Sequence, residues 1–133
     1  MTLLVLAEDD DDIRKLSARI LRRAGHTVIE AVNGAEALEA VREHNPAAVI
    51  SDVDMPVMTG VELSLALRAD PATRDLPVIY VSGSLIPGDS RPEEGQATSV
   101  LLKPFLPADL LACVEKALET GHDHGAGLGE SSP

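Results

Sequence analysis

Short apolar runs alternate with longer segments of helical periodicity along most of the chain. The runs are LLVLA, TVIEA, AAVIS, VIYVS and SVLL, at residues 3–7, 27–31, 47–51, 78–82 and 99–102. Each is almost continuously apolar, which is typical of a strand that is covered on both faces. Strands that alternate with helices form a parallel sheet, because each crossover returns through a helix on one face. We therefore predict an α/β fold of five successive βα units, (βα)5.

The connections predict the order of these strands. Right-handed crossovers favour a doubly wound sheet, and the common flavodoxin-like order for five strands is 2-1-3-4-5. In this order the first and third strands are neighbours, at the point where the winding reverses. Ligands of open α/β sheets bind outside the carboxyl ends of the strands at this point. The residues that follow these two strands are therefore the first candidates for a functional site.

The first helical segment contains an apolar stripe that we expect to face the core. The stripe consists of Ile13, Leu16, Ile20 and Leu21, and the helix should end before Gly25.

The other helical segments differ in the strength of their signals. The second begins near Asn33, a favourable N-cap, and the third and last span about residues 60–69 and 107–119. The fourth should lie within residues 83–96, but this segment contains two prolines and three glycines. Both residue types are unfavourable inside a helix. We expect an atypical or short fourth helix, or a loop.

One domain accounts for most of the chain. Its 133 residues fit a single domain, and 44% hydrophobic residues suffice for one core. We assign residues 1–120 to this domain and expect residues 121–133, which are rich in Gly and Ser, to be a disordered tail or a linker. Such a tail fits a stand-alone domain and a fragment of a longer protein equally well.

The charge of the chain restricts its partners. The net charge of −11 argues against nucleic acid and anionic membrane surfaces as direct partners, because both are polyanions. No apolar run approaches the length of a membrane span, and the N-terminus lacks the features of a signal peptide. The single cysteine, Cys113, cannot form an intramolecular disulfide. We therefore expect a reducing, cytoplasmic location.

Five consecutive acids, residues 8–12, follow the first apolar run. Asp10 and the two acids after it suit the start of a helix, where negative charge meets the positive end of the helix dipole. Glu8 and Asp9 lie at the carboxyl end of the first strand, and Asp52 lies at the end of the third. Carboxylates brought together there repel one another unless a cation neutralises them. Oxygen ligands without histidine or cysteine indicate Mg²⁺ or Mn²⁺.

Two further residues at the same sheet edge complete a phosphoryl-binding set. Ser82 ends the fourth strand and Lys103 follows the fifth. The Lys103 ammonium group could neutralise a phosphoryl group and donate a hydrogen bond to it. Mg²⁺ usually keeps coordination sites for water or phosphate oxygens. One of the carboxylates would then be the nucleophile that forms an aspartyl phosphate.

The motifs that carry these residues resemble the receiver domain of bacterial two-component response regulators. They are VLAEDDDDIR, AVNGAEAL, SDVDMPVMTG, LPVIYVSG and LLKPF, in the order and near the spacing of that family, over about residues 3–118. The resemblance implies that Asp52 is the phosphoacceptor. It also implies that Asp9 binds Mg²⁺ directly, that Glu8 contributes through water, and that the backbone carbonyl of Asp54 is the third protein ligand.

The resemblance also concerns the switch between two conformations. It makes Ser82 the switch hydroxyl and Lys103 the lysine that contacts the phosphoryl group, with a cis bond to Pro104 in many relatives. The family often has Tyr or Phe three residues before this lysine, but here the position is Val100. An aromatic side chain on the fifth strand therefore cannot transmit the switch in this chain.

The function implied is that of a phosphoacceptor signalling domain, which catalyses only its own phosphorylation and dephosphorylation. Its donor would be a histidine kinase or a histidine phosphotransfer protein, and its downstream protein target and any homodimer stay open. One alternative is a pseudo-receiver that binds a protein without being phosphorylated. A less favoured alternative is a phosphatase of the haloacid dehalogenase type, whose DxD motif DVDM at residues 52–55 resembles. The order of the acidic motifs argues against the phosphatase.

Overall fold

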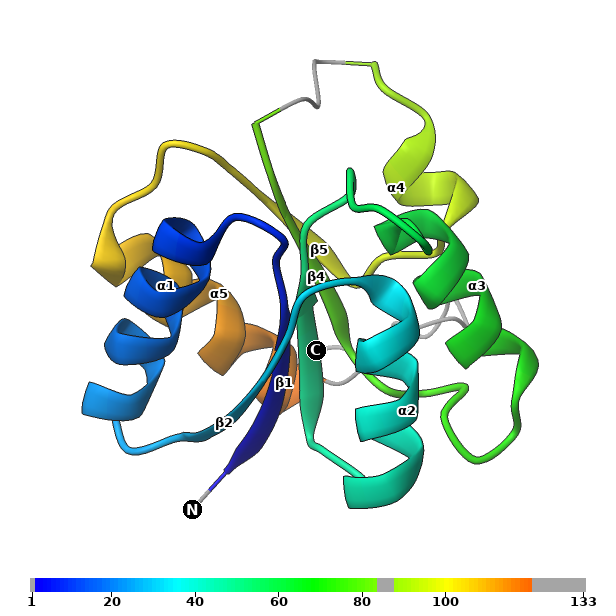
Figure 1. Ribbon diagram of the computed structural model, residues 1–133, viewed down its shortest axis with the longest axis horizontal. Coiled ribbons are helices and arrows are strands. Elements are labelled where there is room, and N and C mark those ends of the chain that lie inside the picture. The colour runs from blue at the N-terminus through cyan, green and yellow to red at the C-terminus, as the bar shows by residue number, and fades with distance from the viewer. Residues whose placement is uncertain (1, 84–87, 121–133) are drawn as a thin grey trace.

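A computed structural model describes residues 2–83 and 88–120 of the chain (Figure 1). Strands and helices alternate along these residues, in the order β1 Leu3–Ala7, α1 Asp11–Arg23, β2 Thr27–Ala31, α2 Gly34–His44, β3 Ala48–Ser51, α3 Gly60–Ala69, β4 Val78–Ser82, α4 Arg91–Glu94, β5 Ser99–Leu102 and α5 Pro107–Thr120. All paired strands are parallel, and their order is β2-β1-β3-β4-β5. The predicted doubly wound α/β fold is therefore confirmed.

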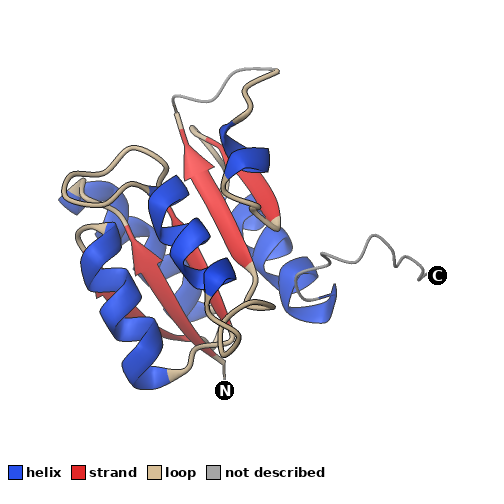
Figure 2. Ribbon diagram, turned by 90° about the vertical axis from the view of Figure 1, so that its right-hand side faces the viewer, coloured by secondary structure: helices blue, strands red, loops and turns tan. Residues whose placement is uncertain are grey.

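Helices cover both faces of the sheet (Figures 1 and 2). The side chains of β1 alternate between two cores: Leu4 and Leu6 pack with α1 and α5, whereas Val5 and Ala7 pack with α2 and α3. All four are almost completely buried. Full burial of a leucine or valine side chain contributes roughly 1.5–3 kcal/mol. Burial on both faces explains why the strands are continuous apolar runs in the sequence.

The register of the central strands places the ends of β1 and β3 side by side. Ala7, the last residue of β1, pairs with Ser51, the last residue of β3. One residue further, the Asp52 N–H donates to the Ala7 carbonyl at 3.0 Å, and the Glu8 N–H donates to the Ala31 carbonyl at 3.0 Å. Glu8 and Asp52 are therefore the first residues after two neighbouring strand ends and lie side by side at the carboxyl edge of the sheet.

The core-facing side of α1 differs from the predicted stripe. Of the four predicted residues only Leu21 is buried, and Leu16 is 53% exposed. Ser17 and Ala18 face the core instead. Their small side chains allow the helix to approach the sheet, so the longer apolar side chains lie at the edge of the interface.

The helix starts are fixed by side-chain caps. The Asp10 carboxylate accepts a hydrogen bond from the Ile13 N–H at 3.0 Å, as expected for the acids at this end of α1. Asn33 caps α2 in the same way, and Thr59 and Glu62 form a reciprocal capping box at the start of α3.

Helix α4 is a single turn, as its prolines and glycines predicted. It is followed by Gly95, where a Cβ atom would overlap the Tyr80 hydroxyl group of β4. On β5, the strand at one end of the sheet, Val100 is 38% exposed and Leu102 is 50% exposed. No helix within residues 2–83 and 88–120 has both the length and the apolar character to cross a membrane. The predicted tail, residues 121–133, lies outside the described residues.

Candidate functional site

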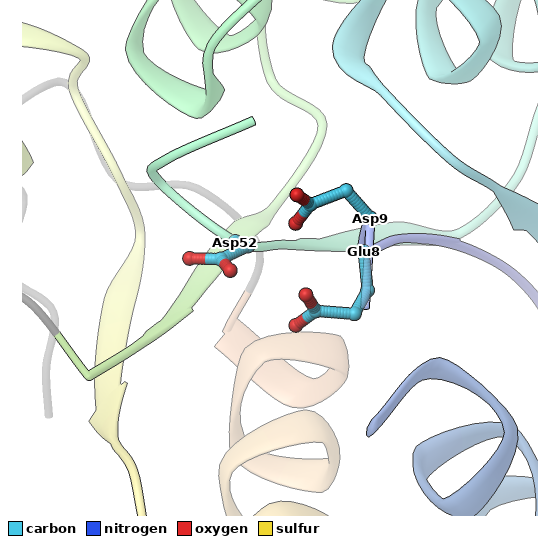
Figure 3. Close-up of side chains that lie close together, drawn as sticks. All are labelled: Glu8, Asp9 and Asp52. Atoms are coloured by element: carbon cyan, nitrogen blue, oxygen red, sulfur yellow. The ribbon is translucent and has the colours of Figure 1, made fainter. Parts of the chain in front are cut away.

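Three carboxylates meet at the carboxyl ends of β1 and β3. Glu8 and Asp9 point from the end of β1 toward Asp52 at the end of β3 (Figure 3). One oxygen of each lies within 4.8 Å of the others. Glu8 and Asp52 are buried, whereas Asp9 is exposed. The strand order predicted this convergence, and the structure contains it.

The Asp52 carboxylate is oriented by its neighbours. Its Oδ1 accepts hydrogen bonds from the N–H groups of Val53 at 2.7 Å and Asp54 at 3.4 Å. Its Oδ2 accepts one from Lys103 Nζ at 3.1 Å. A Cβ atom at Gly60 would overlap the Asp52 carbonyl oxygen, so the loop after β3 can return this closely to α3 only with glycine. The carboxylate is therefore held in place before any ligand binds.

Lys103 is shared between two carboxylates. Its Nζ also donates to Glu8 Oε1 at 2.7 Å, and Glu8 Oε2 accepts from the Asp10 N–H at 3.1 Å. Burial raises the pKa of Glu8 to about 7, although the hydrogen bond from Lys103 opposes this shift. Burial alone would lower the pKa of Lys103, but Glu8 and Asp52 together raise it. Lys103 is thus a charged counterion of the cluster.

The donor set of this cluster suits a hard divalent cation. Glu8, Asp9 and Asp52 offer only carboxylate oxygens, and Lys103 can neutralise only one of their charges. Mg²⁺ and Mn²⁺ prefer such oxygen ligands. The exposed Asp9 carboxylate gives an ion access from solvent.

Ser82 lies at the same edge of the sheet. It is buried at the end of β4, and its carbonyl accepts a hydrogen bond from the Lys103 N–H at 3.0 Å. This bond aligns the ends of β4 and β5. The peptide bond between Lys103 and Pro104 is cis, as the resemblance implies. All the strand-end residues selected from the sequence are therefore on one edge.

Sequence reasoning missed one cation at this edge. Arg91, the first residue of α4, lies with its Nη1 3.1 Å from Asp54 Oδ1. The two residues are 37 positions apart, and the segment around Arg91 has no helical periodicity that would orient its side chain. The only signal in the sequence was the position of Arg91 after β4, because the carboxyl end of β4 faces the site.

An apolar groove of about 370 Å³ extends from the site between α1 and the loop that precedes α5. Its lining includes Lys103 together with the apolar residues Ile13, Leu16, Ile20, Pro104, Phe105 and Pro107. The displaced apolar side chains of α1 thus line a surface that is continuous with the site. A second hollow along α1 is basic, lined by Lys15, Arg19, Arg22 and Arg23 with Glu30.

Comparisons with known proteins agree with this geometry. The family model described as the response regulator receiver domain matches residues 4–115. The response regulator receiver protein CpdR of Brucella abortus is 36% identical over 122 residues, which cover 89% of this chain and 98% of CpdR. The transcriptional regulatory protein PrrA of Mycobacterium tuberculosis is 38% identical over 116 residues, 86% of this chain but only 49% of PrrA, so the chain spans about half of that relative. The structure of the chemotaxis response regulator CheY4 of Vibrio cholerae superposes with a TM-score of 0.82 at 32% identity, covering 87% of this chain and 98% of CheY4.

Proposed function

This chain belongs to the response regulator receiver domain family, and we propose that it accepts a phosphoryl group on Asp52 from a histidine kinase or a histidine phosphotransfer protein. The observation that carries the proposal is the position of Asp52 beside the carboxylates of Glu8 and Asp9 and within hydrogen-bond distance of the ammonium group of Lys103. Phosphorylation would then shift an equilibrium between two conformations and signal to a protein partner.

The proposed transfer uses groups that are already in place. A carboxylate oxygen of Asp52 forms a bond to phosphorus while the bond from phosphorus to the donor imidazole nitrogen breaks, and the imidazole keeps the electron pair. Lys103 neutralises negative charge on the phosphoryl oxygens, and the Ser82 hydroxyl donates a hydrogen bond to one of them. The backbone N–H of Val53 keeps the carboxylate in position, at 2.7 Å.

We assign the metal to the same carboxylates. Asp9 and Asp52 would bind Mg²⁺ or Mn²⁺ directly, the Asp54 backbone carbonyl would be the third protein ligand, and Glu8 would contribute through water. When bound, the ion supplies positive charge that offsets the charge developing on the transferred group. The oxygen-only donor set and the excess of negative charge support this assignment.

The groove beside Lys103 is the best place for the phosphodonor protein, because a donor that reaches Asp52 must cover the surface around it. An aspartate in place of Leu16, which is 53% exposed, should slow transfer from any histidine kinase that phosphorylates the wild-type chain. Phosphorylation by acetyl phosphate should be unchanged. The same change at Leu65, which is 42% exposed on α3, is the matched control.

Binding of beryllofluoride, a phosphoryl mimic, tests the proposal. The wild-type chain should bind it stoichiometrically and only with Mg²⁺, and Asp52→Asn should abolish both this binding and phosphorylation by acetyl phosphate. A wild-type chain that binds no beryllofluoride would instead support a pseudo-receiver, which the absence of an aromatic residue at Val100 and the single-turn α4 favour. Turnover of simple phosphate esters would support the phosphatase alternative.

The sequence also supports proposals on the bounds of the domain and on the location of the protein. We propose that residues 1–120 form the receiver domain, that residues 121–133 are a tail or linker, and that the protein is cytoplasmic, since Cys113 has no second cysteine with which to pair.

A further inference from the structure

Arg91 connects α4 to the loop that carries the phosphoacceptor. Its Nη1 donates to Asp54 Oδ1 at 3.1 Å. The other side of the guanidinium is held by Asp89, to which Nε donates at 3.2 Å and Nη2 at 2.8 Å. The Asp89 side chain is only 14% exposed and that of Arg91 is 31% exposed. The guanidinium is therefore oriented toward the site before phosphorylation.

Asp54 lies next to the proposed reaction centre. It follows Asp52 by two residues, and its N–H points at Asp52 Oδ1, 3.4 Å away. Its carboxylate is 57% exposed, so its ion pair with Arg91 is accessible to solvent. Exposed ion pairs of this kind are weak and exchange partners readily.

On the basis of the proposed function, we propose that Arg91 transmits phosphorylation of Asp52 to α4. When Asp52 is phosphorylated, the guanidinium exchanges the Asp54 carboxylate for a phosphoryl oxygen, and α4 moves with it. Arg91 is thus a positioning and signalling residue of this site, in a chain that has Val100 in place of the usual aromatic residue.

Charge explains the direction of this exchange. The free Asp52 carboxylate carries one negative charge, whereas a phosphoryl group carries about −1.5 to −2. With the same divalent ion bound, the site therefore becomes more negative on phosphorylation. Arginine also forms charge-assisted hydrogen bonds with phosphate oxygens, which its planar guanidinium can make in a bidentate geometry.

The structure contains a natural reporter of α4. Gly95, directly after α4, lies against the hydroxyl group of Tyr80, and this side chain is completely buried. Among the described residues, that hydroxyl has no hydrogen-bond partner. The chain has one tyrosine and no tryptophan, so its tyrosine fluorescence comes from this position alone. A shift of α4 should change the surroundings of the Tyr80 ring.

The experiment follows beryllofluoride binding by ¹⁹F NMR and tyrosine fluorescence together, with saturating Mg²⁺. The wild-type chain should bind the mimic and change its fluorescence. Arg91→Gln should bind it about 3–10-fold more weakly, because one phosphoryl contact is lost, and should lose the fluorescence change even at saturation.

Two further variants act as controls. Arg91→Lys keeps the positive charge but lacks the planar guanidinium group. It should recover most of the wild-type affinity for beryllofluoride but less of the fluorescence change. Arg74→Gln removes the same charge from an exposed residue before β4, at the opposite edge of the sheet, and should change neither readout.

A double-mutant cycle with Asp54→Asn tests the exchange itself. Removal of the competing carboxylate should tighten beryllofluoride binding about 3-fold or more in the wild-type background. This gain should be smaller in the Arg91→Gln background, where charge relief remains but no guanidinium is left to release.

Each contrary result has a distinct meaning. A wild-type chain that binds no beryllofluoride overturns the proposed function itself. Binding with no change in Tyr80 fluorescence, or with the same change in wild type and Arg91→Gln, overturns only the role of Arg91. An equal gain from Asp54→Asn in both backgrounds shows simple charge relief and overturns the exchange.

Discussion

Lys103 Nζ lies 2.7 Å from Glu8 Oε1, although the two residues are 95 positions apart in the chain. The same Nζ is also 3.1 Å from Asp52 Oδ2. The lysine that is proposed to contact the phosphoryl group is therefore shared between two acids of the cluster, and its single charge offsets only one of theirs. Among the described residues, Lys103 forms ion pairs with Glu8 and Asp52 but not with Asp9. Without a metal ion, repulsion among these carboxylates should make the folded state less stable than that of a variant with one carboxylate fewer.

The first prediction is that Asp9→Asn stabilises the metal-free domain. Removal of one carboxylate relieves repulsion from Glu8 and Asp52. The melting temperature in the presence of EDTA should rise by about 2–5 °C. With excess Mg²⁺ the wild-type chain should gain more than the variant, because the ion binds only the folded state. Differential scanning calorimetry measures both effects, and a lower melting temperature of the variant in EDTA would contradict our interpretation of the cluster.

The second prediction concerns pH. Burial raises the pKa of Glu8 from its ordinary value of about 4.5 to about 7 in the folded state. Between these values the folded chain binds more protons than the unfolded chain, so the contribution of Glu8 to stability is full below about pH 4.5 and is lost as the pH rises through 7. The free energy of unfolding should therefore fall by about 1–3 kcal/mol from this group.

Urea unfolding in EDTA at several values between about pH 5 and pH 8 measures this slope. The comparison with Glu8→Gln isolates the contribution of this group. The variant should show a flatter profile than the wild-type chain. Parallel profiles of the two proteins would refute the assignment of the slope to Glu8.

The sheet could be predicted from the sequence because each strand has a local signal, and the acid cluster could be predicted because it follows from the order of these strands. Strands buried on both faces are continuous apolar runs, and β1 shows this with Leu4 and Val5 in opposite cores. The strand order then determines which strand ends meet. Glu8 and Asp52 could be brought together by this argument without any knowledge of their side-chain conformations.

Other features could not be predicted because they depend on packing. The apolar residues of α1 exceed what its contact with the sheet can cover, so periodicity alone did not show that Ala18 would be buried and Leu16 exposed. The contact of Arg91 with Asp54 joins two irregular segments, where no repeat pattern gives the side-chain direction. The sharing of Lys103 between two acids likewise required the coordinates.

The third prediction concerns backbone strain beside the site. Val57, in the loop between β3 and α3, has φ of 69°, in the left-handed region, and is 81% exposed. This conformation is unfavourable for a β-branched residue, whereas asparagine tolerates it. Val57→Asn should raise the free energy of unfolding by about 0.5–1 kcal/mol. Val32→Asn, which changes a 38% exposed valine outside the left-handed region, should give no gain. Chemical denaturation measures both, and equal effects would argue against strain at Val57.

The fourth prediction concerns the contact between Tyr80 and Gly95. The buried Tyr80 hydroxyl has no hydrogen-bond partner among the described residues, and the neighbouring Ser64 hydroxyl donates to the Gly95 carbonyl instead. A buried polar group without a partner is unfavourable, so Tyr80→Phe should stabilise the domain by about 0.5–2 kcal/mol. Gly95→Ala should destabilise it by about 1–3 kcal/mol, because the new methyl group overlaps the hydroxyl.

The two changes should not be additive. In the Tyr80→Phe background the hydroxyl is absent, and a Cβ atom at Gly95 then meets the ring carbon at 3.1 Å as its nearest neighbour. The cost of Gly95→Ala should therefore fall by about 1 kcal/mol or more in that background. Urea denaturation of the four proteins gives the coupling free energy. A coupling free energy near zero would mean that the backbone at Gly95 moves away from Tyr80 without a cost in free energy. The Tyr80 side chain would then not restrict the position of α4.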